Sequence, residues 1–256
     1  MTKKIFIIPD TQVRPGSDIT HLIAAGKYAV EKKPETIVCL GDWADMPSLS
    51  SYDVGKKSFG GRRYMDDIQA AKDAMVAFLK PIRDEQARLI RNKDKQWNPR
   101  LVLTLGNHEA RITRAVEEDR KLEGLVKIED LGYEESGWEV YPFLVPVSIS
   151  GVTFCHYLTS GVAGRAISTA AALISKKHQS CIVGHQQGKQ IAYATRADGS
   201  NITSMILGSY YTHDEAYMGP QGNKHWRGCA MLHQVNDGQF DEMLLSLDYL
   251  VSKYKE

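Results

Sequence analysis

Short apolar runs alternate with longer amphipathic stretches in the first half of the chain. The runs at 5–8, 37–40 and 101–105 have the length of buried strands. Between them, residues 17–33 and 65–92 carry apolar side chains at three- and four-residue steps, a spacing that predicts two helices. Strands that alternate with helices in this way are typical of an α/β fold.

The second half of the chain is richer in strand patterns and contains one predicted helix, at about 162–176. Asn236-Asp237-Gly238 predicts the turn of a final hairpin. Because no internal repeat or low-complexity linker divides the sequence, we expect a single domain over residues 1–256. Long polar loops of the kind that often carry function lie at 46–64, 119–137 and 209–227. The predicted strands are 144–149, 152–155, 181–183, 189–195, 202–207, 228–235 and 239–247.

The composition is that of an ordinary globular protein. Of 256 residues, 43% are hydrophobic and 25% are charged, which excludes a disordered chain. The net charge is +1, so no overall field draws the protein toward nucleic acid or an anionic membrane. A polyanionic partner would therefore need a local basic patch.

The sequence also predicts a cytoplasmic protein without a membrane partner. No apolar run approaches the ~20 residues needed to span a bilayer, and the apolar stretch near the start is too short for a signal peptide. The cysteines form no CxxC pair and lie in or beside apolar runs, which favours buried free thiols in a reducing compartment. They are Cys39, Cys155, Cys181 and Cys229.

Five apolar runs are followed by a residue that can bind a metal ion. Because ligand sites in α/β sheets gather beyond the carboxyl ends of the strands, one sheet can bring such residues to a single point. Each junction alone has an ordinary explanation as a turn or helix cap, but five junctions together favour a functional site. The residues are Asp10, Asp42, Asn107, His156 and His185.

The order of these junctions resembles the signature of the calcineurin-like metallophosphoesterases, which is D-x-H, GD-x-x-D, GNH-E/D, H and GH-x-H. The resemblance extends over residues 10–187, and the overall look is similar to small bacterial and phage members. Met46 stands where Ser/Thr protein phosphatases have an arginine. The matching residues are Asp10-Thr11-Gln12, Gly41-Asp42-Trp43-Ala44-Asp45, Gly106-Asn107-His108-Glu109, His156 and Gly184-His185-Gln186-Gln187.

The resemblance implies an α/β fold of four layers, α-β-β-α, with two mixed β-sheets packed face to face. It also implies a site for two divalent metal ions bridged by Asp42, which would activate a water for in-line attack on phosphorus. The first metal would take Asp10, Gln12, Asp42 and Gln187. The second would take Asp42, Asn107, His156 and His185.

The resemblance assigns catalysis to His108 and Asp45. His108 would stabilise the transition state and protonate the leaving oxygen. Asp45 would hydrogen-bond His108 and keep it cationic, although a role as a helix cap explains Asp45 equally well.

Two departures from the family pattern fall on the same predicted metal. Gln12 and Gln187 stand where the family has histidine. Since amide and carboxylate oxygens suit Mn²⁺ and Mg²⁺ better than imidazole does, we expect Mn²⁺ as cofactor, with Mg²⁺, Zn²⁺, Fe²⁺ and Ni²⁺ as alternatives. The rival interpretation is that the first metal is absent and one metal acts alone.

The loops contain candidate substrate-binding residues. Arg62 and Arg63 follow the second motif, Arg111 follows the third, and His213 lies in a loop that mixes aromatic and basic residues. Such a mixture suits the stacking of bases along a phosphate-binding groove. It suits an oligomer interface equally well.

These observations predict a metal-dependent phosphoesterase that hydrolyses phosphodiester bonds, with DNA or RNA as the favoured substrate. The alternative within the same chemistry is a phosphomonoesterase or a cyclic-nucleotide phosphodiesterase. The alternative of another class is a non-catalytic scaffold on the same fold, to which the two glutamines point because scaffolds lose ligands.

Overall fold

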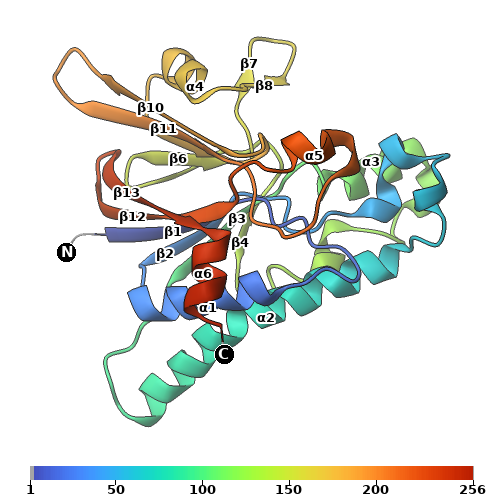
Figure 1. The fold of residues 1–256 in the computed structure, drawn as a ribbon, viewed down its shortest axis with the longest axis horizontal. Coiled ribbons are helices and arrows are strands. Elements are labelled where there is room, and N and C mark those ends of the chain that lie inside the picture. The colour runs from blue at the N-terminus through green and yellow to red at the C-terminus, as the bar shows by residue number, and fades with distance from the viewer. Residues whose placement is uncertain (1–2, 256) are drawn as a thin grey trace.

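The computed structural model describes residues 3–255, which form two large mixed β-sheets with helices on their outer faces (Figure 1). The first sheet has the strand order β13-β12-β1-β2-β3-β4, in which β1 to β4 run parallel and β12 and β13 are antiparallel additions. Its strands are β1 (Lys3–Ile8), β2 (Thr36–Cys39), β3 (Arg100–Thr104), β4 (Glu139–Tyr141), β12 (Gly228–Asn236) and β13 (Gln239–Ser246).

The second sheet has the order β10-β11-β9-β6-β5, with β11, β9 and β6 parallel to one another. The α/β class with two mixed sheets, expected from the sequence, is therefore confirmed. The strands are β5 (Val147–Ile149), β6 (Val152–Cys155), β9 (Cys181–Val183), β10 (Lys189–Thr195) and β11 (Asn201–Leu207), beside a small hairpin of β7 (Thr159–Ser160) and β8 (Arg165–Ala166).

The helices and the single turns of 3-10 helix complete the element list. The helices are α1 (Thr20–Lys32), α2 (Tyr64–Arg91), α3 (Ala110–Glu118), α4 (Ala170–Lys177), α5 (Gly219–Gly222) and α6 (Leu247–Lys253). The 3-10 turns are η1 (Pro47–Leu49), η2 (Ser51–Asp53), η3 (Lys57–Phe59), η4 (Arg120–Leu122), η5 (Ile128–Leu131) and η6 (Ala216–Met218).

Apolar side chains fill the space between the sheets and beneath their outer helices. Successive residues of a strand point to opposite faces, so Ile5 and Ile7 of β1 join the core between the sheets, whereas Phe6 and Ile8 pack under α1 and α2. Strands buried on both faces read as continuous apolar runs, which explains the pattern found in the sequence. A smaller cluster beneath α4, including Leu173 and Val183, covers the outer face of the second sheet.

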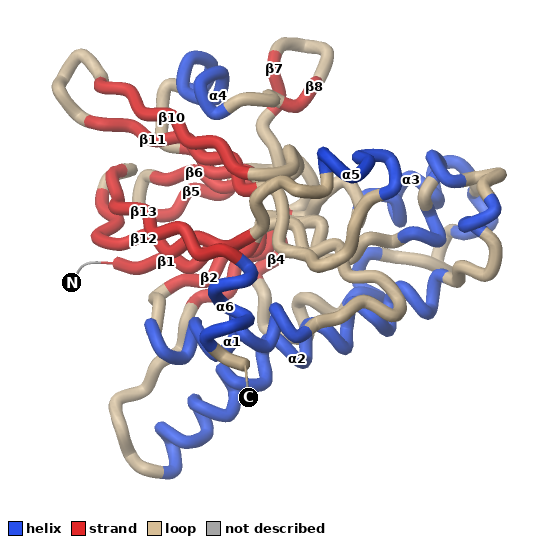
Figure 2. The backbone as a smooth tube through the Cα atoms, viewed as in Figure 1, coloured by secondary structure: helices blue, strands red, loops and turns tan. Residues whose placement is uncertain are grey.

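The loops that follow the strands gather at one side of the molecule, opposite the N-terminus (Figure 2). The chain starts at the far end of β1, so the carboxyl ends of the parallel strands point toward these loops. Among residues 3–255, no helix has both the length and the apolar character required to cross a bilayer.

One predicted helix is shorter than expected, and several short elements were not predicted. The helix expected at 162–176 is wrong in its first half, because α4 begins only at Ala170 and the preceding residues form the β7–β8 hairpin. The predicted strand at 144–149 begins at Val147, whereas the hairpin turn at 236–238 is confirmed by the pairing of Asn236 with Gln239. The elements that were not predicted are β4, β7, β8, α5, α6 and the 3-10 turns.

Candidate metal centre

The five candidate ligands follow the carboxyl ends of strands in both sheets. Asp10, Asp42 and Asn107 come after β1, β2 and β3, and His156 and His185 come after β6 and β9. The structure brings together ligand atoms of Asp42, His156 and His185 that all lie within 4.8 Å of one another. The sequence predicted convergence at the strand ends of one sheet, and this is wrong in one respect: Asp10, Asp42 and Asn107 follow strands of the first sheet, whereas His156 and His185 follow strands of the second.

His156 lies at the centre of this group, with no exposed surface. Its Nδ1 lies 2.8 Å from the carbonyl oxygen of Leu40, while Nε2 lies 2.9 Å from Asn107 Oδ1 and 3.3 Å from Asp42 Oδ2. A backbone carbonyl that accepts from one ring nitrogen orients the other nitrogen toward a ligand. His156 is thus oriented as metal-binding imidazoles are, with Nε2 among oxygen donors.

Backbone hydrogen bonds fix the two buried aspartates. The N–H groups of Thr11 and Gln12 donate to the carbonyl oxygen of Asp42 at 3.1 and 2.8 Å, which joins the turn after β1 to the turn after β2. The N–H of His108 donates to Asp42 Oδ1 at 2.8 Å, and the N–H of His185 lies 3.2 Å from both carboxylate oxygens of Asp10. The carboxylates are therefore held in place by the main chain rather than by flexible side chains.

Two glycines allow this close approach. A Cβ atom on Gly106 would lie 2.0 Å from Asp42 Oδ1, and a Cβ on Gly184 would lie 2.3 Å from Asp10 Oδ1. No side chain fits at such distances, so the glycines of the GNH and GH motifs are required by the aspartates that they adjoin.

Three candidate ligands adopt a backbone conformation that is unfavourable for residues with side chains. The φ angles of Gln12, Asp42 and His185 are 43°, 50° and 66°. Left-handed conformations of this kind cost about 1–3 kcal/mol each and concentrate at functional sites. Their occurrence in three of the proposed ligands supports a site built for ligand geometry rather than for stability.

The electrostatics of the cluster favour positive charge. Burial raises the pKa of Asp10 to about 8. Burial would lower the pKa of His156, but the attraction of Asp42 and Asp10 outweighs it and raises that pKa to about 10. Burial and the neighbouring His156 lower the pKa of His185 to about 4, which keeps its ring neutral. Two adjacent buried carboxylates beside a neutral imidazole fit the donor set of a divalent cation.

His108 and Asp45 form a pair at the border of the cluster. His108 Nδ1 lies 2.8 Å from Asp45 Oδ1, and Nε2 lies 3.7 Å from Asp42 Oδ2. Burial lowers the pKa of His108, but Asp42 and Asp45 more than offset this, so its pKa lies above the ordinary value. Arg111 donates to the carbonyl oxygen of Asp45 at 2.7 Å, and its Nη2 lies 3.1 Å from His108 Nε2.

Glu109 has a role that the sequence did not reveal. Its fully buried carboxylate accepts from the N–H groups of Asp42, Ala44 and Gly106 at 2.9, 3.1 and 2.9 Å, and from the hydroxyl of Tyr133 at 3.1 Å. It therefore ties the turn after β2 to the turn after β3. An acidic residue at the end of the GNH motif was the available signal.

The two glutamines differ in their surroundings, and only Gln12 lines the cavity that contains His108 and His185. Gln12 is 4% exposed, and Gln187 accepts a hydrogen bond from the Tyr211 hydroxyl at 3.0 Å through Oε1. Since an amide oxygen has two lone pairs, this bond leaves Gln187 Oε1 one site for a cation.

A cavity of about 520 Å³ opens beside the cluster and is lined by Gln12, Asn107, His108 and His185. Arg111 and Arg62 line it as well, and Arg62 pairs with Asp53 at 2.8 Å. Two other predicted substrate residues do not line this cavity: the exposed Arg63 and the partly buried His213.

The loop at 209–227, which contains His213, is arranged differently from the stacking surface that the sequence predicted. Tyr210 and Tyr211 are buried, so neither can offer a face to a base. The ring of His213 stacks on Tyr211 with centroids 4.5 Å apart, and its Nε2 lies 2.9 Å from Glu215 Oε1. These residues hold the loop together.

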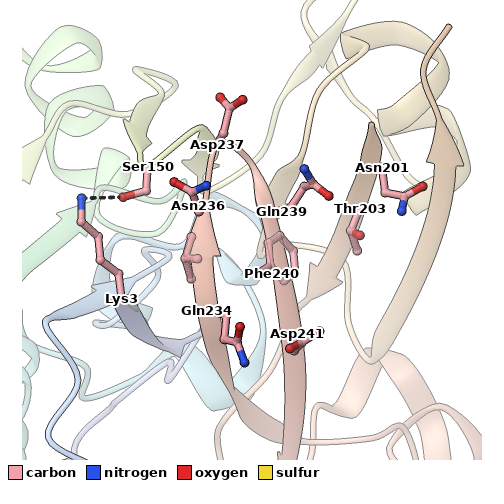
Figure 3. Close-up of a pocket in the computed structure, with 11 residues that line it drawn as sticks. Lys3, Ser150, Asn201, Thr203, Gln234, Asn236, Asp237, Gln239, Phe240 and Asp241 are labelled. Carbon is pink, nitrogen blue, oxygen red and sulfur yellow. Dashed lines mark hydrogen bonds between the residues drawn. The ribbon is translucent and has the colours of Figure 1, made fainter. Parts of the chain in front are cut away.

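A larger cavity, of about 780 Å³, lies at the opposite end of β1 (Figure 3). Its lining is mostly polar and includes Lys3, whose Nζ donates to Ser150 Oγ at 3.1 Å, and Gln239 and Asp241 of β13. Lys3 starts the strand that ends before Asp10, so this cavity is separated from the clustered ligands by the length of β1. We therefore place the candidate site at the smaller cavity, where the titratable groups converge.

The chain is similar in sequence to part of two phage proteins. No family model matches the chain. It is 32% identical over 84 residues to a protein named Gene 54 protein of Mycobacterium phage D29, and 35% identical over 83 residues to the Gene 54 protein of Mycobacterium phage L5. These alignments cover 33% and 32% of this chain and 32% and 31% of the relatives, so the chain spans about a third of the length of the curated relatives it matches.

Proposed function

We propose that the protein is a divalent-metal-dependent phosphoesterase that hydrolyses phosphodiester bonds, with DNA or RNA as substrate. The observation that carries the proposal is the convergence of Asp42, His156 and His185, from three separate strand ends, beside the His108–Asp45 pair. A cluster of oxygen and imidazole donors next to a histidine with a raised pKa is what metal-assisted phosphoryl transfer requires.

The architecture supports the same proposal. Two mixed sheets pack face to face through the core that contains Ile7 and Phe154, and helices cover the outer faces. This arrangement agrees with the α-β-β-α sandwich of the calcineurin-like metallophosphoesterases, which we propose as the family of this chain.

The donors divide into two sets that share Asp42. Asn107, His156 and His185 would hold one cation with Asp42, and Asp10, Gln12 and Gln187 would hold the other. Cations bound there supply Lewis-acid polarisation of the phosphoryl oxygens and a nucleophilic water.

The residues of the chain perform the remaining steps. His108 lines the cavity and contacts Asp45 through Nδ1, and in its cationic form it would donate a proton to the leaving oxygen. Asp45 orients the ring through Nδ1, and Arg111 adds positive charge beside Nε2 where the phosphoryl oxygens enter. The buried carboxylates are held by main-chain N–H groups, so the site needs little reorganisation during the reaction.

The test is hydrolysis by the purified protein with Mn²⁺, Mg²⁺ or Zn²⁺. The substrates are single-stranded DNA, duplex DNA, RNA, an aryl phosphate diester and an aryl phosphate monoester. We expect hydrolysis of the diester and of nucleic acid that EDTA abolishes, and none by Asp42→Asn. Preference for the monoester would instead indicate a phosphomonoesterase. The absence of any metal-dependent hydrolysis would contradict the proposal and favour a non-catalytic scaffold.

A further inference from the structure

Two exposed tyrosines stand at the cavity beside the candidate metal centre. Tyr52 belongs to η2 in the loop at 46–64 and is 82% exposed, and Tyr217 belongs to η6 in the loop at 209–227 and is 76% exposed. Both line the cavity that contains His108, and they reach it from segments far apart in the sequence. Figure 1 shows these two segments, coloured blue and orange-red, on the side of the molecule that carries α3. Both rings are therefore accessible to a ligand that enters this cavity.

Basic side chains accompany the tyrosines in the same cavity. Arg14 lies 3.3 Å from Glu215 Oε1, so the ion pair orients its guanidinium at the cavity. Lys56 and Arg62 both pair with Asp53, at 2.7 and 2.8 Å. Grooves that bind single-stranded nucleic acid combine two features: cationic side chains contact the phosphates, and aromatic side chains stack on the bases.

We propose that this cavity binds single-stranded nucleic acid, with unpaired bases stacked on Tyr52 and Tyr217 and the backbone directed to the candidate metal centre. This inference rests on the proposed function and adds the substrate class. A base in a duplex has both faces covered by its neighbours, so only an unpaired base can offer a face to a tyrosine. The cavity of about 520 Å³ is within the range of about 300–1,000 Å³ typical of small-molecule sites, which suits a base and its phosphates rather than a double helix.

The cavity chemistry favours nucleic acid over a protein partner. Tyrosine and arginine are enriched at protein interfaces as well. Here, however, the tyrosines line one cavity with His108, the proposed proton donor, and with Asn107 and His185, two proposed metal ligands. A ligand that stacks on both tyrosines therefore lies where its phosphate can reach that centre.

The test is equilibrium binding in EDTA, which measures binding without any hydrolysis. A fluorescein-labelled DNA single strand of about 12 nucleotides, within the known site sizes of single-strand grooves, is titrated with the full chain and followed by anisotropy, beside a duplex of the same sequence. We expect the single strand to bind at least about tenfold more tightly than the duplex. The Tyr52→Ala plus Tyr217→Ala variant should raise the Kd for the single strand by about tenfold to a hundredfold, since each stacked base contributes substantially to binding.

Matched variants separate stacking from folding. Tyr52→Phe plus Tyr217→Phe keeps the rings and should retain the wild-type Kd, and Tyr249→Ala, an exposed tyrosine on α6, should leave it unchanged. Equal binding of single strand and duplex, or a wild-type Kd for the double alanine variant, would overturn the inference. Hydrolysis of the aryl diester is measured separately on the same protein preparations, with Mn²⁺ in place of EDTA. Its failure with intact single-strand binding would remove the proposed catalysis alone, and hydrolysis without single-strand preference would remove only the substrate class.

Discussion

Two buried histidines, His21 on α1 and His156 after β6, show opposite electrostatic behaviour in one protein. His21 is 2% exposed and packs edge-on against Tyr210, with ring centroids 5.0 Å apart. Burial lowers its pKa to about 4. His156 is buried more completely, yet Asp42 and Asp10 overcome the effect of burial and raise its pKa to about 10.

The difference shows what burial does and does not determine. Removing an imidazole from water makes it neutral unless opposite charge accompanies it. At His156 the protein has placed two carboxylates inside the fold, with main-chain N–H groups aimed at them, and this arrangement attracts positive charge. In the surroundings of His21, here called the neutral region, burial dominates the pKa of the histidine. In the surroundings of His156, here called the charged region, Asp42 and Asp10 outweigh burial.

The largest expected effect tests whether the charged region acts in catalysis. Replacing His108 by alanine should lower kcat on the aryl diester by about 10²–10⁴-fold, the range for loss of a general acid. Metal stoichiometry measured by calorimetry should stay as in the wild type, because His108 is not among the proposed ligands. Unchanged turnover would show that the pair of His108 and Asp45 is structural.

The next effect concerns the neutral region and depends on pH. Between pH 6.5 and about pH 4 the unfolded chain takes up a proton at His21 that the folded protein does not, so stability falls as pH falls through this window. The full loss is about 3 kcal/mol, the free energy that corresponds to lowering an imidazole pKa from 6.5 to about 4. Urea unfolding at several pH values should show a steeper decline for the wild type than for His21→Phe. Parallel curves would contradict a neutral buried His21.

A third prediction tests whether the two glutamines of the charged region contact a cation. Changing Gln12 and Gln187 to histidine should raise Zn²⁺ affinity by about tenfold to a hundredfold, a range typical of changes around metal sites. Calorimetric titration of wild type and variant with Zn²⁺ and Mn²⁺ measures the change. Identical stoichiometry and affinity in both proteins would show that these positions do not contact a cation.

The smallest effect sharpens the description of the neutral region. Tyr210 donates a hydrogen bond through its hydroxyl to the carbonyl oxygen of His21 at 2.8 Å. Tyr210→Phe should therefore lower the free energy of unfolding by about 1 kcal/mol, the usual contribution of one hydrogen bond. Thermal unfolding at neutral pH gives the value, and an increase in stability would mean that the hydroxyl is strained rather than satisfied.

The parts of the fold that the sequence predicted are those with a strong apolar period. β1, β2 and β3 are buried on both faces, so each appears as a continuous apolar run. β4 was missed because Glu139–Tyr141 is a short edge strand whose residues are exposed or only partly buried. α6 was missed because it follows β13 without a break, and one apolar pattern continues through both.

In the candidate site, too, some features were predictable from the sequence and others were not. The residues at strand ends were predictable because the parallel order of the strands fixes where their carboxyl ends lie. The loop contacts were not predictable: the pairing of Arg14 with Glu215 joins residues about two hundred positions apart, and the exposure of Tyr52 depends on the path of its loop. Such contacts depend on tertiary packing that leaves no period in the sequence.

The candidate ligands come from both sheets, Asp42 and Asn107 from one and His156 and His185 from the other. A cation held by all four would cross-link the two layers at the open end of the apolar core. Because unfolding must separate these layers, a cation bound between them would raise the free energy of unfolding. At a metal concentration a hundred times the Kd, the native state would gain about 2.7 kcal/mol by mass action alone.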